Sequence, residues 1–337
     1  MMKYCFLFYW LIIASTAVNA QNNDAATLLE TGRQFLRSGD FTNAVLVLNK
    51  ALQQEPNNLQ VLKELSMTYY LQRDFTKAKE TVKPLVERED ADVPTFQIAG
   101  NIYKALEEVK ECDRMYRKGI KKFPDAGPLY AEYGDLLWKQ KDFSAISQWE
   151  NGIRNDPNYP GNYYHAAKHY FMSADKAWTL IYGEIFVNME SYSSRTAEIK
   201  NLLLEAYKKL FTEDSRAKTT RSKTAFAQAF YSTLIQYGNL ANAGVNTETL
   251  IAVRTRFLLD WDRQYAARFP HRLFDLHRQL LQEGMFEAYN HWIFTAAGNL
   301  AAFDNWTKTH VEAYNAFSGF QRGRVFKLPA EHYYQSN

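Results

Sequence analysis

Two histidines have the spacing of a metal site. His165 and His169 lie four residues apart in a predicted helix, and this spacing places both imidazoles on one face, where they can bind zinc. A zinc protease carries its catalytic glutamate directly after the first histidine, but here that residue is Ala166. No third ligand stands nearby in the sequence. We therefore predict no metal and no cofactor.

A single acid, Glu184, interrupts an otherwise apolar helix face. A buried carboxyl group at such a place is a candidate general acid or base. The alternative, which we favour, is a structural carboxylate paired with one of three arginines, Arg195, Arg254 or Arg256. The chain has no Gly-rich phosphate loop, no G-x-S-x-G elbow and no paired cysteines, so we predict no catalytic residue.

The overall charge argues against nucleic-acid binding. The formal net charge is +3 over 337 residues, and so small an excess creates no field suited to capturing a polyanion. Aromatic residues make up 15% of the chain, which favours a well-packed protein over a disordered one.

Residues 1–20 have the features of a secretory signal peptide. Lys3 supplies the positive charge, residues 5–18 form an apolar run too short to span a bilayer comfortably, and Val18 and Ala20 suit cleavage before Gln21. An uncleaved anchor is the alternative. No second apolar run of about 18 residues follows, so we expect no integral membrane segment after cleavage.

The number of cysteines helps to predict the cellular compartment of the protein. After cleavage Cys112 is the only cysteine, so no intramolecular disulfide can form. A large exported chain without disulfides favours the bacterial periplasm, with secretion as the alternative.

A period of 34 residues organises the chain after the predicted leader. Its first instance runs from Leu28 to Pro56, and four instances are clear, followed by a looser fifth. Small residues let two helices approach closely, and large ones fill the space between successive units. The corresponding positions, unit by unit, are Leu28, Gly32, Phe35, Ala44, Leu48 and Ala51; Leu62, Ser66, Tyr69, Ala78, Val82 and Leu85; Phe96, Gly100, Tyr103, Cys112, Tyr116 and Gly119; Tyr130, Gly134, Leu137, Ala145, Trp149 and Gly152; and Tyr163, Ala167, Tyr170, Ala177, Ile181 and Glu184.

This pattern resembles the tetratricopeptide repeat, a pair of antiparallel helices, A and B, with a period of 34. The resemblance covers residues 25–190. It implies an all-α fold in which about five repeats stack into a superhelix.

Residues 191–337 still have helical patterns but lose the period. We expect an aromatic-rich helical C-terminal region there. Residues 272–298 repeat the spacing of the fourth unit through Leu280, Gly284, Phe286, Ala288 and Trp292. The region is therefore either a divergent continuation of the superhelix that contains a degenerate repeat, or a separate bundle docked on the last repeat. The expected helices cover residues 195–211, 223–237, 247–269, 272–283, 285–297 and 304–317.

The resemblance also implies a groove lined by helix A of each repeat. Carried over position by position, its candidate residues are basic and aromatic with the single acid Asp135, a composition that suits an extended peptide with acidic groups or a free carboxylate. The alternative is that these are ordinary solvated residues, with the C-terminal half packed into the groove. The candidates are Arg33, Leu36, Arg37, Lys63, Met67, Tyr70, Gln97, Asn101, Lys104, Asp135, Trp138, Lys139, Tyr164, Lys168 and Phe171.

These observations favour a non-enzymatic interaction or scaffold protein of the bacterial envelope that binds a peptide or protein segment. One alternative is an enzyme with an unrecognised site in the C-terminal half. Another is an architectural subunit of an outer-membrane or secretion assembly. The sequence does not indicate an oligomeric state.

Overall fold

The structure is a computed structural model that describes residues 24–211 and 224–335. The predicted signal peptide and its cleavage point lie outside these residues. All regular elements in the described ranges are helical, which confirms the all-α fold, and none of these helices is long and apolar enough to cross a membrane. The chain divides into two compact units, residues 1–90 and 91–337.

The first unit contains the first two predicted repeats. Its helices are α1 (Ala25–Arg37), α2 (Phe41–Gln54), α3 (Leu59–Leu71) and α4 (Phe75–Val82). Leu28, Leu48, Val61 and Leu65 form its core. The side chains of Asp40 and Asp74 cap α2 and α4 by accepting hydrogen bonds from backbone N–H groups of the first turn. In the first unit the sequence thus starts each helix B with a capping acid.

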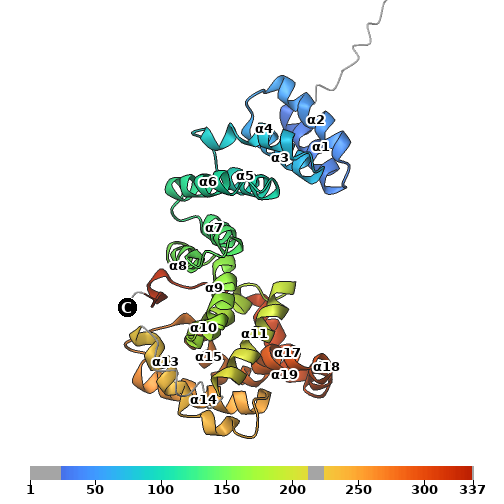
Figure 1. The fold of residues 1–337 in the computed structure, drawn as a ribbon. Coiled ribbons are helices and arrows are strands. Elements are labelled where there is room, and N and C mark those ends of the chain that lie inside the picture. The colour runs from blue at the N-terminus through green and yellow to red at the C-terminus, as the bar shows by residue number, and fades with distance from the viewer. Residues whose placement is uncertain (1–23, 212–223, 336–337) are drawn as a thin grey trace, which may run out of the picture. The chain divides into compact units, whose positions relative to one another are not determined.

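The second unit begins with three further helix pairs, which follow one another along the chain in Figure 1. In the repeats that contain Gly100 and Gly134, helices A and B meet at these glycines. A Cβ atom on Gly134 would lie 2.2 Å from Nε1 of Trp149, and one on Gly100 would lie 2.1 Å from the Tyr116 hydroxyl. The helix pairs are α5 (Val93–Ala105) with α6 (Val109–Lys122), α7 (Gly127–Lys139) with α8 (Ala145–Asn155), and α9 (Pro160–Met172) with α10 (Lys176–Met189).

Four turns between helix A and helix B place the same position in the left-handed region. Gly39, Arg73, Glu107 and Lys141 have φ values of 77°, 62°, 57° and 61°, and they follow one another at the 34-residue period. Three of the four are not glycine, although this conformation is unfavourable for residues with a side chain. The tight turn therefore recurs because the packed helices on either side require it.

The helices after residue 191 largely match the expected ranges, with one correction. The single helix expected over residues 304–317 is two helices that meet at His310. The observed helices are α11 (Ser194–Leu210), α13 (Ala225–Ile235), α14 (Thr247–Gln264), α15 (Arg272–Gln282), α16 (Phe286–Asn290) with a π-helical turn (His291–Thr295) and α17 (Ala296–Gly298), α18 (Leu300–Thr309) and α19 (Val311–Gly323).

The segment predicted to be a degenerate repeat forms a helical hairpin. Helix α15 turns at Gly284 into α16, and Gly284 has a φ of 72°, close to that of Lys141 at the equivalent position of the fourth repeat. The C-terminal helices also share one continuous hydrophobic core with α8, α9 and α10, which contains Trp149, Trp178 and Trp261. The repeats and the C-terminal helices of the second unit are thus packed as one body.

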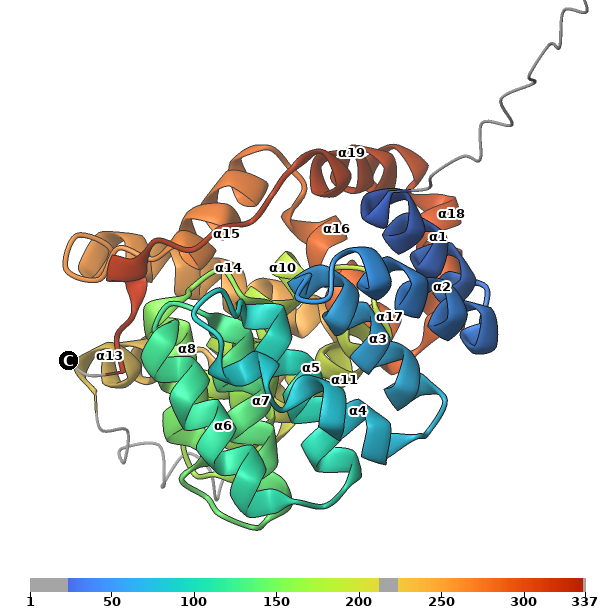
Figure 2. The ribbon, with the colours of Figure 1, turned by 90° about the horizontal axis from the view of Figure 1, so that it is seen from above.

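A C-terminal segment, residues 324–335, runs back across the second unit. Figure 2 shows it in red, leaving α19 and passing α15 toward α8 and α13. The N–H of Leu328 donates to Oδ1 of Asn158 at 2.9 Å, and the Tyr334 ring stacks on Phe226 with centroids 4.6 Å apart. The described segment therefore packs on the core through Phe326, Leu328 and Tyr334.

The same segment completes a buried cluster around one carboxyl group. Glu150 of α8 accepts hydrogen bonds from the hydroxyls of Tyr170 and Tyr182, each at 2.9 Å, and from Tyr333 of the C-terminal segment. Burial raises the pKa of Glu150 to about 7, although the three hydroxyls act to lower the pKa.

This pKa makes stability depend on pH. Because the folded pKa lies above the usual value of 4.5, the contribution of Glu150 to stability is fully present below pH 4.5 and is lost as pH rises through about 7. The thermal unfolding midpoint of the wild type should therefore fall between pH 5 and 8. We expect this fall to be smaller in Glu150→Gln. An unchanged pH profile in this variant would contradict the assignment.

The glycine contacts give a second prediction. Gly134→Ala should lower the free energy of unfolding by about 1–3 kcal/mol, because its methyl group would displace Trp149. Gly319→Ala in α19 is the control, since no atom lies within 4 Å of its Cβ position, and it should stabilise slightly. Urea unfolding of both variants measures the difference, and equal midpoints would show that the close approach is not required.

Candidate interaction surface and a buried ion cluster

Four helices of the second unit form a continuous row. Helices α5, α7 and α9 are the helices A of their repeats, and each contacts the next. Helix α11 contacts α9 and so extends the row. Glu198 of α11 lies 34 residues after Tyr164 and accepts a hydrogen bond from its hydroxyl. The period therefore continues for one more helix than the sequence interpretation allowed, and the spacing from Tyr164 to Glu198 is the signal that was missed.

Nine of the predicted groove residues lie on this row. Apart from buried Tyr164 and exposed Lys139, they are partly buried. We call them, together with Glu198, the helix-A surface. The nine are Gln97, Asn101 and Lys104 on α5, Asp135, Trp138 and Lys139 on α7, and Tyr164, Lys168 and Phe171 on α9.

The cations of the helix-A surface are each paired with an acid. Lys104 lies 3.5 Å from Glu132, Lys139 lies 2.8 Å from Asp135, and Lys168 lies 2.6 Å from Glu198. The excess of positive charge expected from the sequence is therefore not present. The acids Glu132 and Glu198 were missed because each belongs to the repeat after that of its lysine.

Aromatic rings form the other component of the surface. Trp138 has the rings of Phe143 and His169 at 5.6 Å each, and Phe143 is 66% exposed. Lys209 of α11 places its Nζ 3.9 Å from the centroid of the Phe171 ring. An exposed or half-buried aromatic beside paired charges is typical of protein interaction surfaces.

The two histidines with metal-site spacing pack against tryptophans. The His165 ring stacks on Trp149 at 5.2 Å, and His169 lies edge-on to both Trp149 and Trp138. Burial lowers the pKa of His165 to about 4, which keeps the imidazole neutral. Across residues 24–211 and 224–335 no group of three metal-ligating side chains converges, at these histidines or elsewhere.

A hollow of about 410 Å³ opens between the third and fourth repeats. Its lining includes Lys104 and Glu107 of the third repeat, Lys139 and Gln140 of the fourth, and buried Cys112. Burial raises the pKa of the Cys112 thiol to about 12, so the thiol is not a nucleophile near neutral pH. The hollow joins two lysines of the helix-A surface.

The remaining predicted groove residues lie in the first unit. Arg33 donates to Glu64 of α3 at 2.7 Å, and exposed Arg37 pairs with Glu30 at 2.8 Å. Lys63 is buried, whereas Met67 and Tyr70 are half-buried. Here too the arginines are matched by acids.

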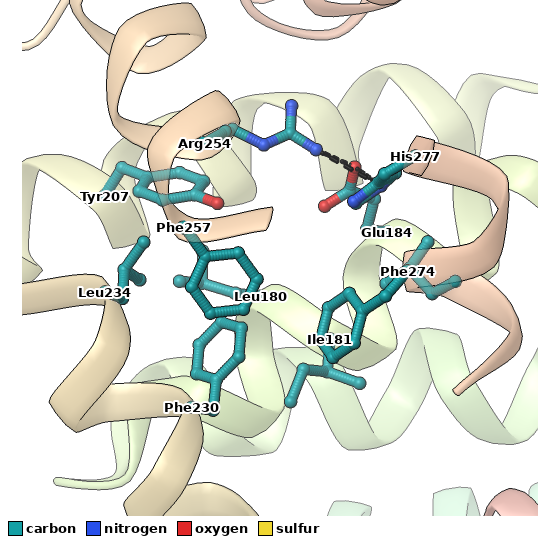
Figure 3. Close-up of a pocket in the computed structure, with 11 residues that line it drawn as sticks. Leu180, Ile181, Glu184, Tyr207, Phe230, Leu234, Arg254, Phe257, Phe274 and His277 are labelled. Atoms are coloured by element: carbon teal, nitrogen blue, oxygen red, sulfur yellow. Dashed lines mark hydrogen bonds and ion pairs between the residues drawn. The ribbon is translucent and has the colours of Figure 1, made fainter. Parts of the chain in front are cut away.

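Glu184, the acid on the apolar face of α10, lies at the centre of a buried ion cluster. Figure 3 shows Arg254 of α14 and His277 of α15 pointing at its carboxylate. His277 Nε2 is 2.8 Å from Oε1 of Glu184, and the Tyr289 hydroxyl donates to the same oxygen at 2.8 Å. Of the three arginines considered from the sequence, Arg254 is the partner.

The electrostatics of this cluster favour a permanent ion pair. Burial acts to raise the pKa of Glu184, but Arg254 and His277 outweigh it and lower the pKa to about 2. Burial also lowers the pKa of His277 despite the nearby carboxylate. Glu184 is thus ionised and His277 neutral over the physiological range, and neither is poised for proton transfer near pH 7.

The space beside the cluster is too small for a substrate. Phe230, Phe257 and Phe274 surround a cavity of about 10 Å³, which is room for one water molecule at most. The cluster therefore joins α10, α14, α15 and α16 and gives no support to catalysis by Glu184.

A substitution at Arg254 tests this structural role. Arg254→Met should destabilise the protein by about 3–5 kcal/mol, because it leaves the Glu184 carboxylate buried without its cation. The matched control is Arg256→Met, an exposed position on the same helix, with an expected effect within about 0.5 kcal/mol. Thermal unfolding of both variants provides the measurement, and similar midpoints would contradict the role given to the ion pair.

Comparisons with known proteins support the repeat assignment. A family model for the tetratricopeptide repeat matches residues 35–99. No curated protein sequence matches the chain.

Several solved structures resemble the chain. A tetratricopeptide-repeat protein of Thermus thermophilus is 16% identical, with a TM-score of 0.44 over 53% of this chain and 99% of that one. PilF of Pseudomonas aeruginosa is 14% identical, with a TM-score of 0.48 over 62% and 96%. A MamA fragment from Desulfovibrio magneticus is 13% identical, with a TM-score of 0.41 over 50% and 97%. Nothing about the function of this chain follows from these similarities.

The family match and the observed helices lead to one assignment. Residues 35–99 span parts of the first three units of the 34-residue period, and the helix–turn–helix pairs from α1 to α10 follow that period. Repeat arrays of this kind present extended surfaces for binding other proteins. The chain therefore contains tetratricopeptide repeats.

Proposed function

We propose that this protein is a non-enzymatic scaffold of the bacterial envelope that binds a segment of a partner protein on its helix-A surface. The observation that carries the proposal is the row of aromatic and charged side chains, most of them half-buried, on α5, α7, α9 and α11. Half-buried aromatics anchor a partner at small cost in conformational entropy.

The charge pairs constrain the chemistry of the partner. Since Lys104, Lys139 and Lys168 each have a nearby acid, the surface offers alternating charges in place of one sign. A segment that carries both signs, with an apolar or aromatic side chain beside Trp138, fits this pattern better than a purely acidic peptide.

The envelope setting rests on the leader. A positive residue, a short apolar run and small residues before Gln21 are the features of an exported chain. The envelope assignment is therefore independent of the binding surface and is tested by a separate measurement.

Site-specific photocrosslinking in intact cells tests the proposal. A photoreactive phenylalanine analogue replaces Trp138 or Phe171, and the matched control carries it at Arg114, an exposed residue of α6 outside the helix-A surface. We expect the same partner to crosslink at Trp138 and Phe171 and not at Arg114, because only the first two positions lie in the proposed contact.

Two further readouts complete the experiment. The crosslinked protein should be released by osmotic shock and begin at Gln21, as export and cleavage require. Adding Lys104→Glu and Lys139→Glu should weaken crosslinking at Trp138 by about tenfold, through like-charge repulsion with Glu132 and Asp135. Equal crosslinking at all three positions would contradict the surface, and an intact leader in the cytoplasm would contradict the setting.

A further inference from the structure

One arginine of the second unit has an incomplete set of partners. Arg324 is the first residue of the C-terminal segment, and its guanidinium lies against the end of α10, where Nη2 donates to Oδ1 of Asn188. The guanidinium carbon is 5.3 Å from the Phe320 ring centroid and 5.7 Å from that of Phe326. These contacts hold the guanidinium in place between two rings.

The other two nitrogens of Arg324 have no acceptor. Nε and Nη1 have no contact with solvent and no hydrogen-bond partner within the described part of the chain. Buried donors of this kind are rare in native proteins, and each points to a bound water, an ion or a functional role. A bound acceptor would complete the hydrogen bonding of these two nitrogens.

The charge around Arg324 is also uncompensated. The buried Arg254 pairs with the carboxylate of Glu184, whereas among the described residues Arg324 bonds only to the neutral amide of Asn188. A second cation, Arg272, lies nearby, with its guanidinium 6.0 Å from the Phe326 ring. Burial lowers the pKa of Arg324, and Arg272 acts in the same direction. A bound anion would offset both the burial of the Arg324 charge and its repulsion from Arg272. A neutral water molecule would not compensate either positive charge.

Neighbouring groups are free to take part. The Tyr192 hydroxyl and the Gln321 side chain are linked only by a long contact of 3.4 Å, and Gln321 reaches Ser191 at 3.3 Å. Tyr192 is 70% exposed, so its side chain lies at the solvent edge. A hydroxyl and an amide at such distances can turn toward a ligand at little cost.

We propose that Arg324 is the centre of a binding site for a small oxyanion, a carboxylate or a phosphate group, with Tyr192 and Gln321 as additional donors. An oxyanion accepts several charge-assisted hydrogen bonds at once and supplies the negative charge that the site lacks. This inference is independent of the helix-A surface and of the envelope setting.

Thermal unfolding of the full-length protein in sodium phosphate or sodium acetate tests the site. Each anion is added up to about 50 mM at constant ionic strength, with sodium chloride making up the balance. The wild-type midpoint should rise by roughly 3 °C or more at about ten times the dissociation constant. The anion with the larger effect identifies the preferred ligand chemistry.

Variants separate the site from general salt effects. Arg324→Gln should abolish the rise, while Arg322→Gln, an exposed position near the end of α19, should retain it. Arg324→Lys keeps the charge and Tyr192→Phe keeps the fold, so both should bind with affinity weakened by about tenfold or less relative to wild type. No rise in wild type, or an equal rise in wild type and Arg324→Gln, would overturn the proposal.

Discussion

The ion pair between Glu184 and Arg254 is the interaction on which the second unit most depends. Glu184 occupies the helix-B position at which the third and fourth repeats carry Gly119 and Gly152. A carboxylate there cannot pack as a small residue does, and buried without a cation it would be costly. Arg254, His277 and the Tyr289 hydroxyl supply its partners from three later helices.

The acid at this repeat position explains why the regular stacking of helix pairs ends at the fifth repeat. In the earlier repeats small residues let another helix pair stack closely. In the fifth repeat the acid instead bonds to side chains of α14, α15 and α16. A common core forms around Phe257, Phe274 and Phe286. The C-terminal helices are therefore integral to the last repeat. Such a buried network also favours one arrangement of these helices over others, since any shift would leave a charge unpaired.

Much of the fold could be predicted from the sequence, because the repeat fixes both residue size and spacing. Gly100 and Gly134 predict close contacts between helices, and the structure places Tyr116 and Trp149 against them. The break between α18 and α19 was missed because the helical pattern of residues 304–317 runs through His310 without a proline or glycine. Propensity alone does not mark such a break.

The candidate surface was only half predictable. The resemblance indicated which residues of α5, α7 and α9 share a side. It did not reveal that Lys104 and Lys168 are matched by Glu132 and Glu198, because pairing across neighbouring repeats depends on how two helices pack. Arg324 was missed for a related reason. Its lack of a partner is a property of the folded environment and has no sequence signature.

The return of residues 324–335 to α8 and α9 has a consequence for how the protein is made. Leu328 bonds to Asn158 and Gln335 to Tyr170, contacts that span 170 and 165 positions of the chain. Contacts of such long range slow folding, since a large loop must close before they form. The core around Glu150 can close only once residues 324–335 have been made and can pack on it. Until these residues dock, the second unit exposes aromatic surface of the kind that chaperones recognise.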